Sequence, residues 1–290
     1  MIYLASQYGW RAGLATALVA LTLTGRAAAA EDAVTLAPHR AVYDLALSAA
    51  RGGMGVVSVT GRLVYDLTGS SCEGYTQNTR LVTRMTQQSG ITLVADLRST
   101  TWEDGVGKRF RFESTQYRDD KLSEATTGEA ARQQGGAGEI KVDLTKPDKR
   151  SIFLPAGAYF PVQHTIALIQ AARAGKASFR ADLYDGSEKG EKVFDTVAAL
   201  GRPLAPGANR ELPGVANADR LDAVKSWPVS LAFFEARAGR VDALPSYEMA
   251  FWLFENGVSR KLSIDYGDFA MQGDLKDIVF HEPSKCEQKK

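Results

Sequence analysis

The sequence predicts a mainly β protein in which one large antiparallel β-structure wraps around a single α-helix. Segments of alternating apolar and polar residues recur at intervals of about ten residues or slightly more, with turn signals between them. Only residues 154–175 carry the marks of a helix, and strand-like segments lie on both sides of it in the sequence. Direct connections of this length join antiparallel neighbours, so we expect a meander.

The predicted helix lies between Pro161 and Gly175. Proline suits the first helical position, and glycine suits the left-handed residue just past the end. Arg173 complements the negative end of the helix dipole. Apart from a thin polar stripe at Gln163 and Gln170, the segment is apolar on nearly every side, so it must be surrounded. It is shorter than the roughly 20 residues that span a bilayer, so the expected surrounding is the sheet.

The expected strands are bounded by turn signals such as Asp104-Gly105 and Asn256-Gly257, which are typical of hairpins. Pro147-Asp148 should end the last strand before the helix, and residues 203–219, with three prolines, should form a long surface loop. The expected strands are Ala41–Ser48, Val56–Leu67, Tyr75–Met85, Ile91–Thr101, Lys108–Tyr117, Leu122–Thr127, Glu139–Leu144, Ser178–Tyr184, Glu191–Val197, Val229–Ala236, Tyr247–Glu255, Val258–Tyr266 and Asp274–His281.

Residues 1–30 have the pattern of a cleaved signal peptide. Arg11 precedes a short apolar core, and residues 27–30 are four alanines of the kind that a signal peptidase needs. Removal of this segment leaves residues 31–290 with 33 basic and 34 acidic side chains, which predicts no nucleic-acid partner. We expect one domain over 31–290, exported from the cytosol and without a transmembrane segment.

The chain has two cysteines, Cys72 and Cys286. An even number in an exported chain favours a disulfide bond, and the alternative is two buried thiols. A bridge would attach the end of the last strand to the early part of the sheet.

The sequence contains no established catalytic, cofactor or metal-binding motif. Residues 69–73 fail the GxSxG pattern at its last position. A zinc site built from His39, His164 and His281 is conceivable, but we expect an exposed His39, a buried His164 bonded to a carbonyl or carboxylate, and His281 at a strand end. The acidic pair Glu103-Asp104 is expected to serve a turn.

The segment Phe251-Trp252-Leu253-Phe254 places apolar residues on both faces of one strand. An antiparallel strand of this kind must be covered twice. The helix can cover one face. More core, a hydrophobic ligand or a partner protein could cover the other.

Three parts of the chain together resemble a known family. They are residues 61–67 (Gly-Arg-Leu-Val-Tyr-Asp-Leu) running into 72–75 (Cys-Glu-Gly-Tyr), residues 154–157 (Leu-Pro-Ala-Gly) leading into 160–161 (Phe-Pro), and Cys286 after the final strand. This order resembles the EipB-like family of cell-envelope integrity proteins from Gram-negative α-proteobacteria, long carried as a domain of unknown function.

The resemblance covers essentially all of the mature chain. It implies a periplasmic, single-domain β-spiral, which is an unclosed barrel-like sheet around a helix. It also implies one disulfide bond, with Cys72 and Cys286 in the places of the family's cysteines. The implied role is maintenance of the envelope, with a periplasmic tetratricopeptide-repeat protein as a candidate partner. No enzymatic activity, cofactor or catalytic residue is implied.

The leading functional hypothesis is a non-enzymatic periplasmic protein that supports envelope integrity through protein–protein contacts. The alternative is a periplasmic carrier of a lipid or another apolar ligand, which needs an interior that side chains leave empty. The central helix speaks against that alternative, because it fills the interior. A hydrolase lacks a motif, and an outer-membrane barrel fits poorly with one bulky helix and the charged tail of residues 288–290.

Overall fold

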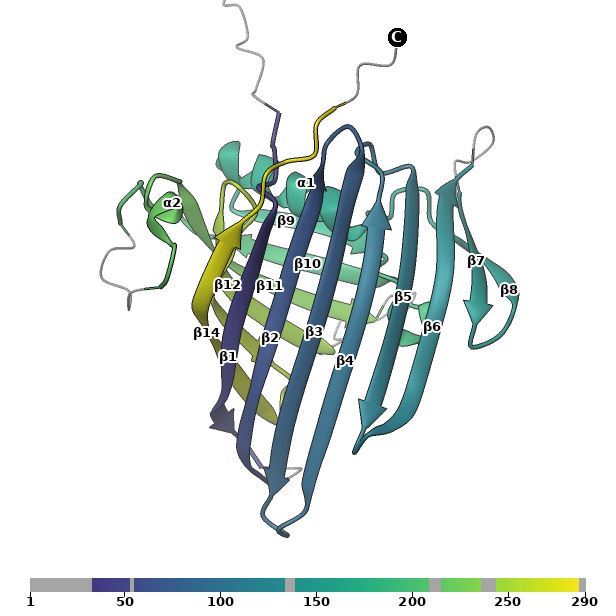
Figure 1. Ribbon diagram of the computed structural model, residues 1–290, viewed down its shortest axis with the longest axis vertical. Helices are drawn as coiled ribbons and strands as arrows, with labels where there is room; N and C mark the ends of the chain where they lie inside the picture. The colour runs from purple at the N-terminus through teal and green to yellow at the C-terminus, as the bar shows by residue number, and fades with distance from the viewer. Residues whose placement is uncertain (1–32, 53–54, 134–138, 209–214, 236–243, 287–290) are drawn as a thin grey trace, which may run out of the picture. The chain divides into compact units, whose positions relative to one another are not determined.

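The computed structural model describes residues 33–52, 55–133, 139–208, 215–235 and 244–286. Residues 34–290 cluster as one compact unit, and the expected signal peptide at 1–30 lies outside the described residues. Within them, a single 14-stranded sheet contains every strand (Figure 1). The strands are β1 (His39–Ala50), β2 (Val56–Ser70), β3 (Gly74–Gln87), β4 (Thr92–Glu103), β5 (Arg109–Arg118), β6 (Lys121–Arg132), β7 (Ile140–Lys146), β8 (Arg150–Leu154), β9 (Ser178–Leu183), β10 (Phe194–Leu200), β11 (Ser226–Glu235), β12 (Tyr247–Phe254), β13 (Ser259–Asp265) and β14 (Phe269–Phe280).

The sheet consists of two antiparallel meanders that meet where β1 pairs with β14. Its order runs from β8 down to β1, then from β14 down to β9. The two edge strands, β8 and β9, are therefore adjacent in the sequence, and the helix α1 (Pro161–Arg173) connects them. The prediction of a mainly β fold with one antiparallel, unclosed sheet and a central helix is confirmed.

Alternation along the strands creates one buried face. In β1, the side chains of Ala41, Tyr43 and Leu45 are buried, while Arg40 and Ala46 on the other face are exposed. Successive side chains of a strand point to opposite faces, so the pairing of β1 with both β2 and β14 carries this buried face from one meander to the other.

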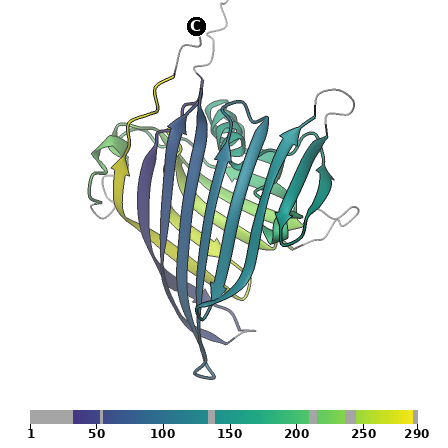
Figure 2. The same cartoon turned by 45° about the vertical axis from the view of Figure 1, so that its right-hand side comes forward.

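The helix α1 packs between the two meanders at one end of the sheet (Figures 1 and 2). Its buried Val162, Leu168 and Ile169 join a core cluster that contains Leu67 from the first meander and Trp227 from the second. Gln170 is its only exposed side chain. The prediction of a surrounded helix is therefore confirmed.

The ends of α1 are where the sequence places them. Pro161 is the first helical residue, and Gly175 lies beyond the end with φ 69°, a conformation that suits glycine. The Lys176 N–H donates to the Ala171 carbonyl at 3.0 Å, which closes the helix end.

Four segments differ most from the sequence-based expectation. Strand β6 extends to Arg132 instead of ending at Thr127. Strand β8 was missed, because after Pro147-Asp148 its five residues are too few to show a clear alternation. Strand β14 begins at Phe269 instead of Asp274. Part of the expected surface loop at 203–219 forms bridges instead, as Leu204 pairs with Ser226 and Ala216 with Asp277.

The second face of the aromatic strand β12 is covered by the protein itself. Phe254 is fully buried in a cluster with Leu221, which lies on the short helix α2 (Asp219–Asp222). Leu253, on the other face of β12, belongs to the cluster around α1. At these two positions, therefore, core residues of the protein cover both faces of β12.

Among the described residues, neither α1 nor α2 has the length and apolar character that a membrane crossing needs.

Candidate functional site: the docked helix, the disulfide and the interior cleft

A buried carboxyl group holds the N-terminus of α1. Glu103, the last residue of β4, is 1% exposed and accepts hydrogen bonds from the backbone N–H groups of Val162 at 2.7 Å and Gln163 at 3.0 Å. The first N–H groups of a helix have no partner within the helix, and the N-cap residue Phe160 has no side-chain acceptor. Glu103 therefore supplies from a distant strand the cap that the local sequence lacks.

Arg132, on β6, holds the chain that leads into the helix. Its guanidinium donates hydrogen bonds to the carbonyl oxygens of Gly107 at 2.7 Å, Ala156 at 2.6 Å and Ala158 at 2.7 Å. The same group lies over the ring of Phe160, 5.2 Å from its centroid. One side chain thus connects a hairpin turn, the lead-in segment and the helix cap.

Burial strongly changes the acidity of Glu103. Desolvation raises the pKa of Glu103 to about 8, and the charge of Asp104 raises it further. The two backbone hydrogen bonds and the positive charge of Arg132 act in the opposite direction but are outweighed. The sequence-based interpretation of Glu103 as a turn residue is wrong, whereas Asp104 does serve the turn, because it accepts a hydrogen bond from the Lys108 N–H at 2.7 Å.

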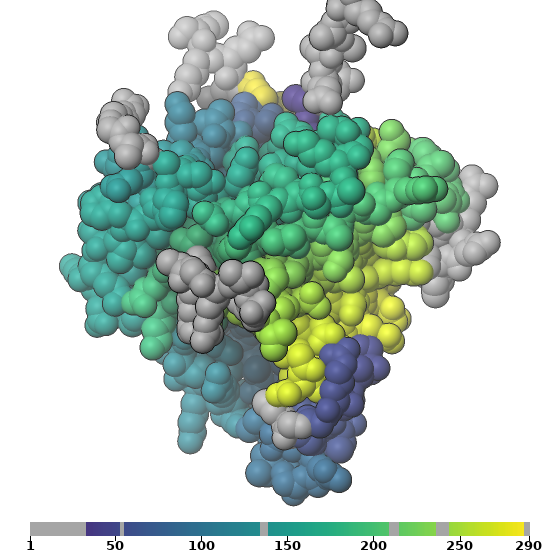
Figure 3. All heavy atoms as spheres, turned by 180° about the vertical axis from the view of Figure 1, so that it is seen from behind, coloured from purple at the N-terminus to yellow at the C-terminus, as the bar shows by residue number. Residues whose placement is uncertain are grey.

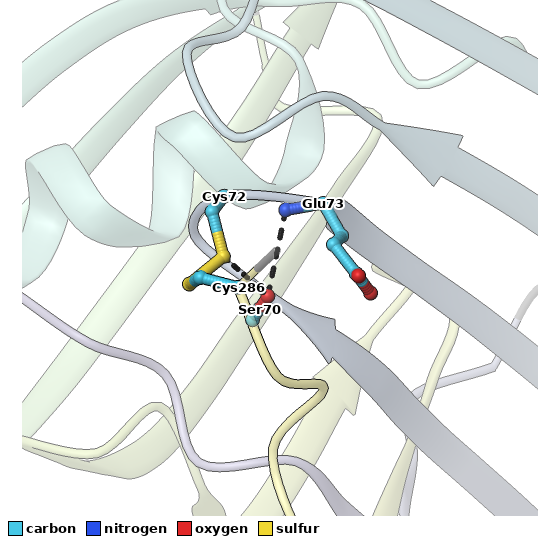
Figure 4. The surroundings of a disulfide bond; sticks show 4 residues. All are labelled: Ser70, Cys72, Glu73 and Cys286. Carbon is cyan, nitrogen blue, oxygen red and sulfur yellow. Dashed lines mark hydrogen bonds between the residues drawn. A yellow bond between two sulfur atoms is a disulfide. The ribbon is translucent and has the colours of Figure 1, made fainter. Parts of the chain in front are cut away.

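The predicted disulfide bond joins Cys72 and Cys286, whose Cα atoms are 5.7 Å apart (Figure 4). Cys72 lies in the turn between β2 and β3, and Cys286 lies in the tail that follows β14. The hydroxyl of Ser70 is 3.1 Å from the Cys72 sulfur and also accepts the Glu73 N–H at 3.4 Å. The bond closes a sequence separation of 214 residues and attaches the tail to the first meander.

The tail makes further contacts on its way to the disulfide. The N–H of His281 donates to the carbonyl of Pro38 at 2.9 Å, and its Nε2 lies 3.0 Å from a carboxylate oxygen of Asp66. The Ser284 N–H reaches the carbonyl of Gly69 at 3.4 Å. His281 is just past a strand end, as predicted.

The other two histidines are buried. His39 was expected to be exposed, but it is 1% exposed, because β1 begins at this residue and directs the ring into the sheet, where Nδ1 donates to the Ala37 carbonyl at 2.7 Å. His164 Nε2 lies 3.0 Å from the Thr196 hydroxyl, not from a carbonyl or carboxylate. Across the described ranges, no group of three or more His, Cys, Asp or Glu side chains could hold a metal ion.

An interior cleft of about 520 Å³ opens on the concave face of β3 to β6, beside the start of α1. The helix therefore does not fill the interior, contrary to the sequence-based expectation. A recess is visible between the teal strands of the first meander and the green and yellow strands of the second (Figure 3). Most lining side chains are polar, and they come from distant segments: Gln77, Thr79, Leu97, Ser99, Thr101, Phe112, Ser114, Gln116, Arg118, Glu124, Pro161, Asp185, Gly186, Ser187 and Glu188.

Removal of the disulfide bond is expected to destabilise the oxidised protein. For the double variant Cys72→Ser/Cys286→Ser, chain entropy predicts a free energy of unfolding lower by up to about 5 kcal/mol, given the long loop that the bond closes. Urea unfolding with and without dithiothreitol measures this. In reductant the wild type and the variant should unfold alike, and a variant as stable as the oxidised wild type would contradict the prediction.

Replacement of Glu103 by glutamine is expected to remove a pH dependence of stability. The pKa of Glu103 rises from 4.5 to about 8 on folding, so the folded chain binds the extra proton. The free energy of unfolding of the wild type therefore falls as the pH rises between these values, by at most about 1.4 kcal/mol per pH unit. Above pH 6.5 the buried His164, whose pKa is lowered from 6.5 to about 4, is mostly neutral in both states and adds little.

Urea unfolding from about pH 6.5 to about pH 8 tests this prediction. The wild type and a control variant, Glu113→Gln on the exposed face of β5, should lose stability over this range. Glu103→Gln should show a flatter profile. Parallel profiles for all three proteins would show that Glu103 does not titrate in this range.

Comparison with known proteins agrees with this architecture. The sequence profile of the EipB-like family matches residues 30–282. The chain is 37% identical over 260 residues to the cell envelope integrity protein EipB of Brucella abortus (strain 2308), which covers 89% of each chain. A crystal structure from Brucella abortus, of a β-barrel-like protein of a domain of unknown function, superposes with a TM-score of 0.77 and 35% identity over 86% of this chain and 100% of that one. The chain therefore belongs to the EipB-like family of cell envelope integrity proteins.

Proposed function

We propose that this chain is a non-enzymatic periplasmic protein that supports the cell envelope through protein–protein contacts. Membership of the EipB-like family supports the role in envelope integrity. The disulfide bond between Cys72 and Cys286 supports a location outside the cytosol, because such bonds persist in oxidising compartments. Export by a signal peptide at residues 1–30 and a single domain over residues 31–290 are parts of this proposal.

The main support for a protein–protein contact is the open edge of the sheet at β8. Strand β8 pairs only with β7, so the backbone groups along its other side point away from the sheet. Its Phe153 is 60% exposed, which is unusual for a large aromatic side chain at an edge. Edges of this kind accept an added strand or an apolar surface of a partner. We propose a periplasmic tetratricopeptide-repeat protein as that partner.

The contact is tested by chemical cross-linking in periplasm, followed by mass spectrometry of the captured proteins. The wild type should capture a tetratricopeptide-repeat protein, and Phe153→Lys should reduce this capture severalfold because it removes the apolar contact. Leu122→Lys is the control for a charge placed elsewhere on the sheet: Leu122 is 57% exposed and lies near the start of β6, paired with Tyr117 of β5 and away from β8. Equal capture by both variants would exclude the edge, and the absence of repeat proteins would exclude the partner class.

The alternative function, a carrier of a lipid or another apolar ligand, gains one observation from the structure. The cleft of about 520 Å³ is within the range of ligand pockets. About half of its lining surface is polar, however, and these polar groups would lose hydration without gaining partners against an apolar chain. Native mass spectrometry of the gently purified protein separates the two proposals: a bound lipid would favour the carrier, and a mass equal to that of the polypeptide favours the contact protein.

A further inference from the structure

A row of hydroxyl groups crosses the concave face of the sheet inside the cleft. Ser99 on β4 pairs with Thr79 on β3 and with Ser114 on β5, so the three side chains point to the same face in direct register. The next row places Gln116 beside Leu97. All of these residues line the cleft and are half-buried. Three consecutive strands thus present a row of polar side chains to the cleft.

These groups are not used by the fold. Within the described residues, the side chains of Thr79, Ser99, Ser114 and Gln116 make no hydrogen bond to another protein group. The adjacent row differs, because Thr101 donates to Gln77 at 3.2 Å and Gln77 donates in turn to Tyr65 at 2.8 Å. These half-buried groups have no protein partner in the described part of the chain, so the row is a set of donors and acceptors available to a molecule in the cleft.

The charges of the lining disfavour an anionic ligand. Glu124, Asp185 and Glu188 contribute three carboxyl groups, and Arg118 is the one cationic side chain among the described lining residues. A phosphate or carboxylate in the cleft would be repelled by this excess of acids. Burial raises the pKa of Asp185, which favours its uncharged form, so the repulsion comes mainly from Glu124 and Glu188. The Asp185 side chain accepts the Ser187 N–H at 2.9 Å, within the loop that lines the cleft.

We propose that this cleft binds an uncharged saccharide. Sugars carry several adjacent hydroxyls that both donate and accept, and the free hydroxyls, the amide of Gln116 and the carboxylate of Glu124 offer complementary partners. Leu97 supplies a small apolar surface for the C–H face of a sugar ring. The volume of about 520 Å³ admits a short oligosaccharide. This site is separate from the edge of β8 and does not depend on the proposed protein contact.

Saturation-transfer difference NMR on the full mature chain tests the proposal, with chitotriose and maltotriose as saccharide probes. At least one sugar should receive saturation from the protein. The variant Thr79→Val/Ser99→Ala/Ser114→Ala removes the hydroxyl row without adding bulk, and binding should weaken about tenfold or more as three hydrogen bonds are lost. Ser114→Leu, which places an apolar side chain in the cleft, should weaken it as well.

The control is Thr100→Val/Thr115→Val, which removes two hydroxyls from the opposite face of the same strands β4 and β5. It should bind like the wild type, and circular dichroism should show that all variants are folded. No transfer to either sugar would overturn the proposal, as would equal binding by the triple variant. Spermidine and phosphatidylcholine vesicles are the comparison probes, and binding of only one of these would reassign the cleft to an amine or a lipid.

Discussion

The packing of α1 against the sheet depends on the hydrogen bonds that satisfy the N-terminus of this helix. The N-terminus of α1 is buried between two meanders, where water cannot satisfy its N–H groups. Glu103 satisfies two of them from the end of β4, at the cost of burying a carboxyl group that is 1% exposed. Removal of one member of such a buried set leaves the other without a partner, which is why this contact constrains the structure around it.

The segment that leads into α1 also connects the two edges of the open sheet. No backbone ladder joins β8 to β9 within the described chain. Instead, the lead-in to the helix pairs with the end of β9, where Tyr159 bridges to Leu183. Side chains complete the closure: Phe110 and Phe112 of the first meander pack with Phe160 and Tyr184. Because this bridge is made by the lead-in segment and not by β8, β8 keeps a free edge.

The disulfide bond acts at the opposite boundary of the first meander. It attaches the tail beside the turn between β2 and β3. The hydrogen bonds that His281 and Ser284 make with the first part of the chain also hold the tail, but they are few and partly exposed. The long strands β2 to β5 pair along most of their length, so their inner side chains lie in register. Side chains arranged in register by the backbone form the kind of surface that a preorganised binding site requires.

Much of the fold follows from local patterns. Alternation identified most of the strands, Pro161 and Gly175 marked the ends of the helix, and the even number of cysteines indicated their bond. These features can be predicted because they depend on the nearest neighbours in the chain or on a very small number of candidates. Strand β8 could not be found in this way, because five residues carry too little periodic signal.

The candidate sites were decided by tertiary structure alone. Nothing in the sequence near Glu103 shows that it lies under a helix that begins 58 residues later. Likewise, Thr79, Ser99 and Ser114 are ordinary strand residues until the register of β3, β4 and β5 places them in one row. The sequence of a strand determines which of its residues share a face. Only the pairing of strands determines which side chains become neighbours, and the lining of the cleft consists of such neighbours from different strands.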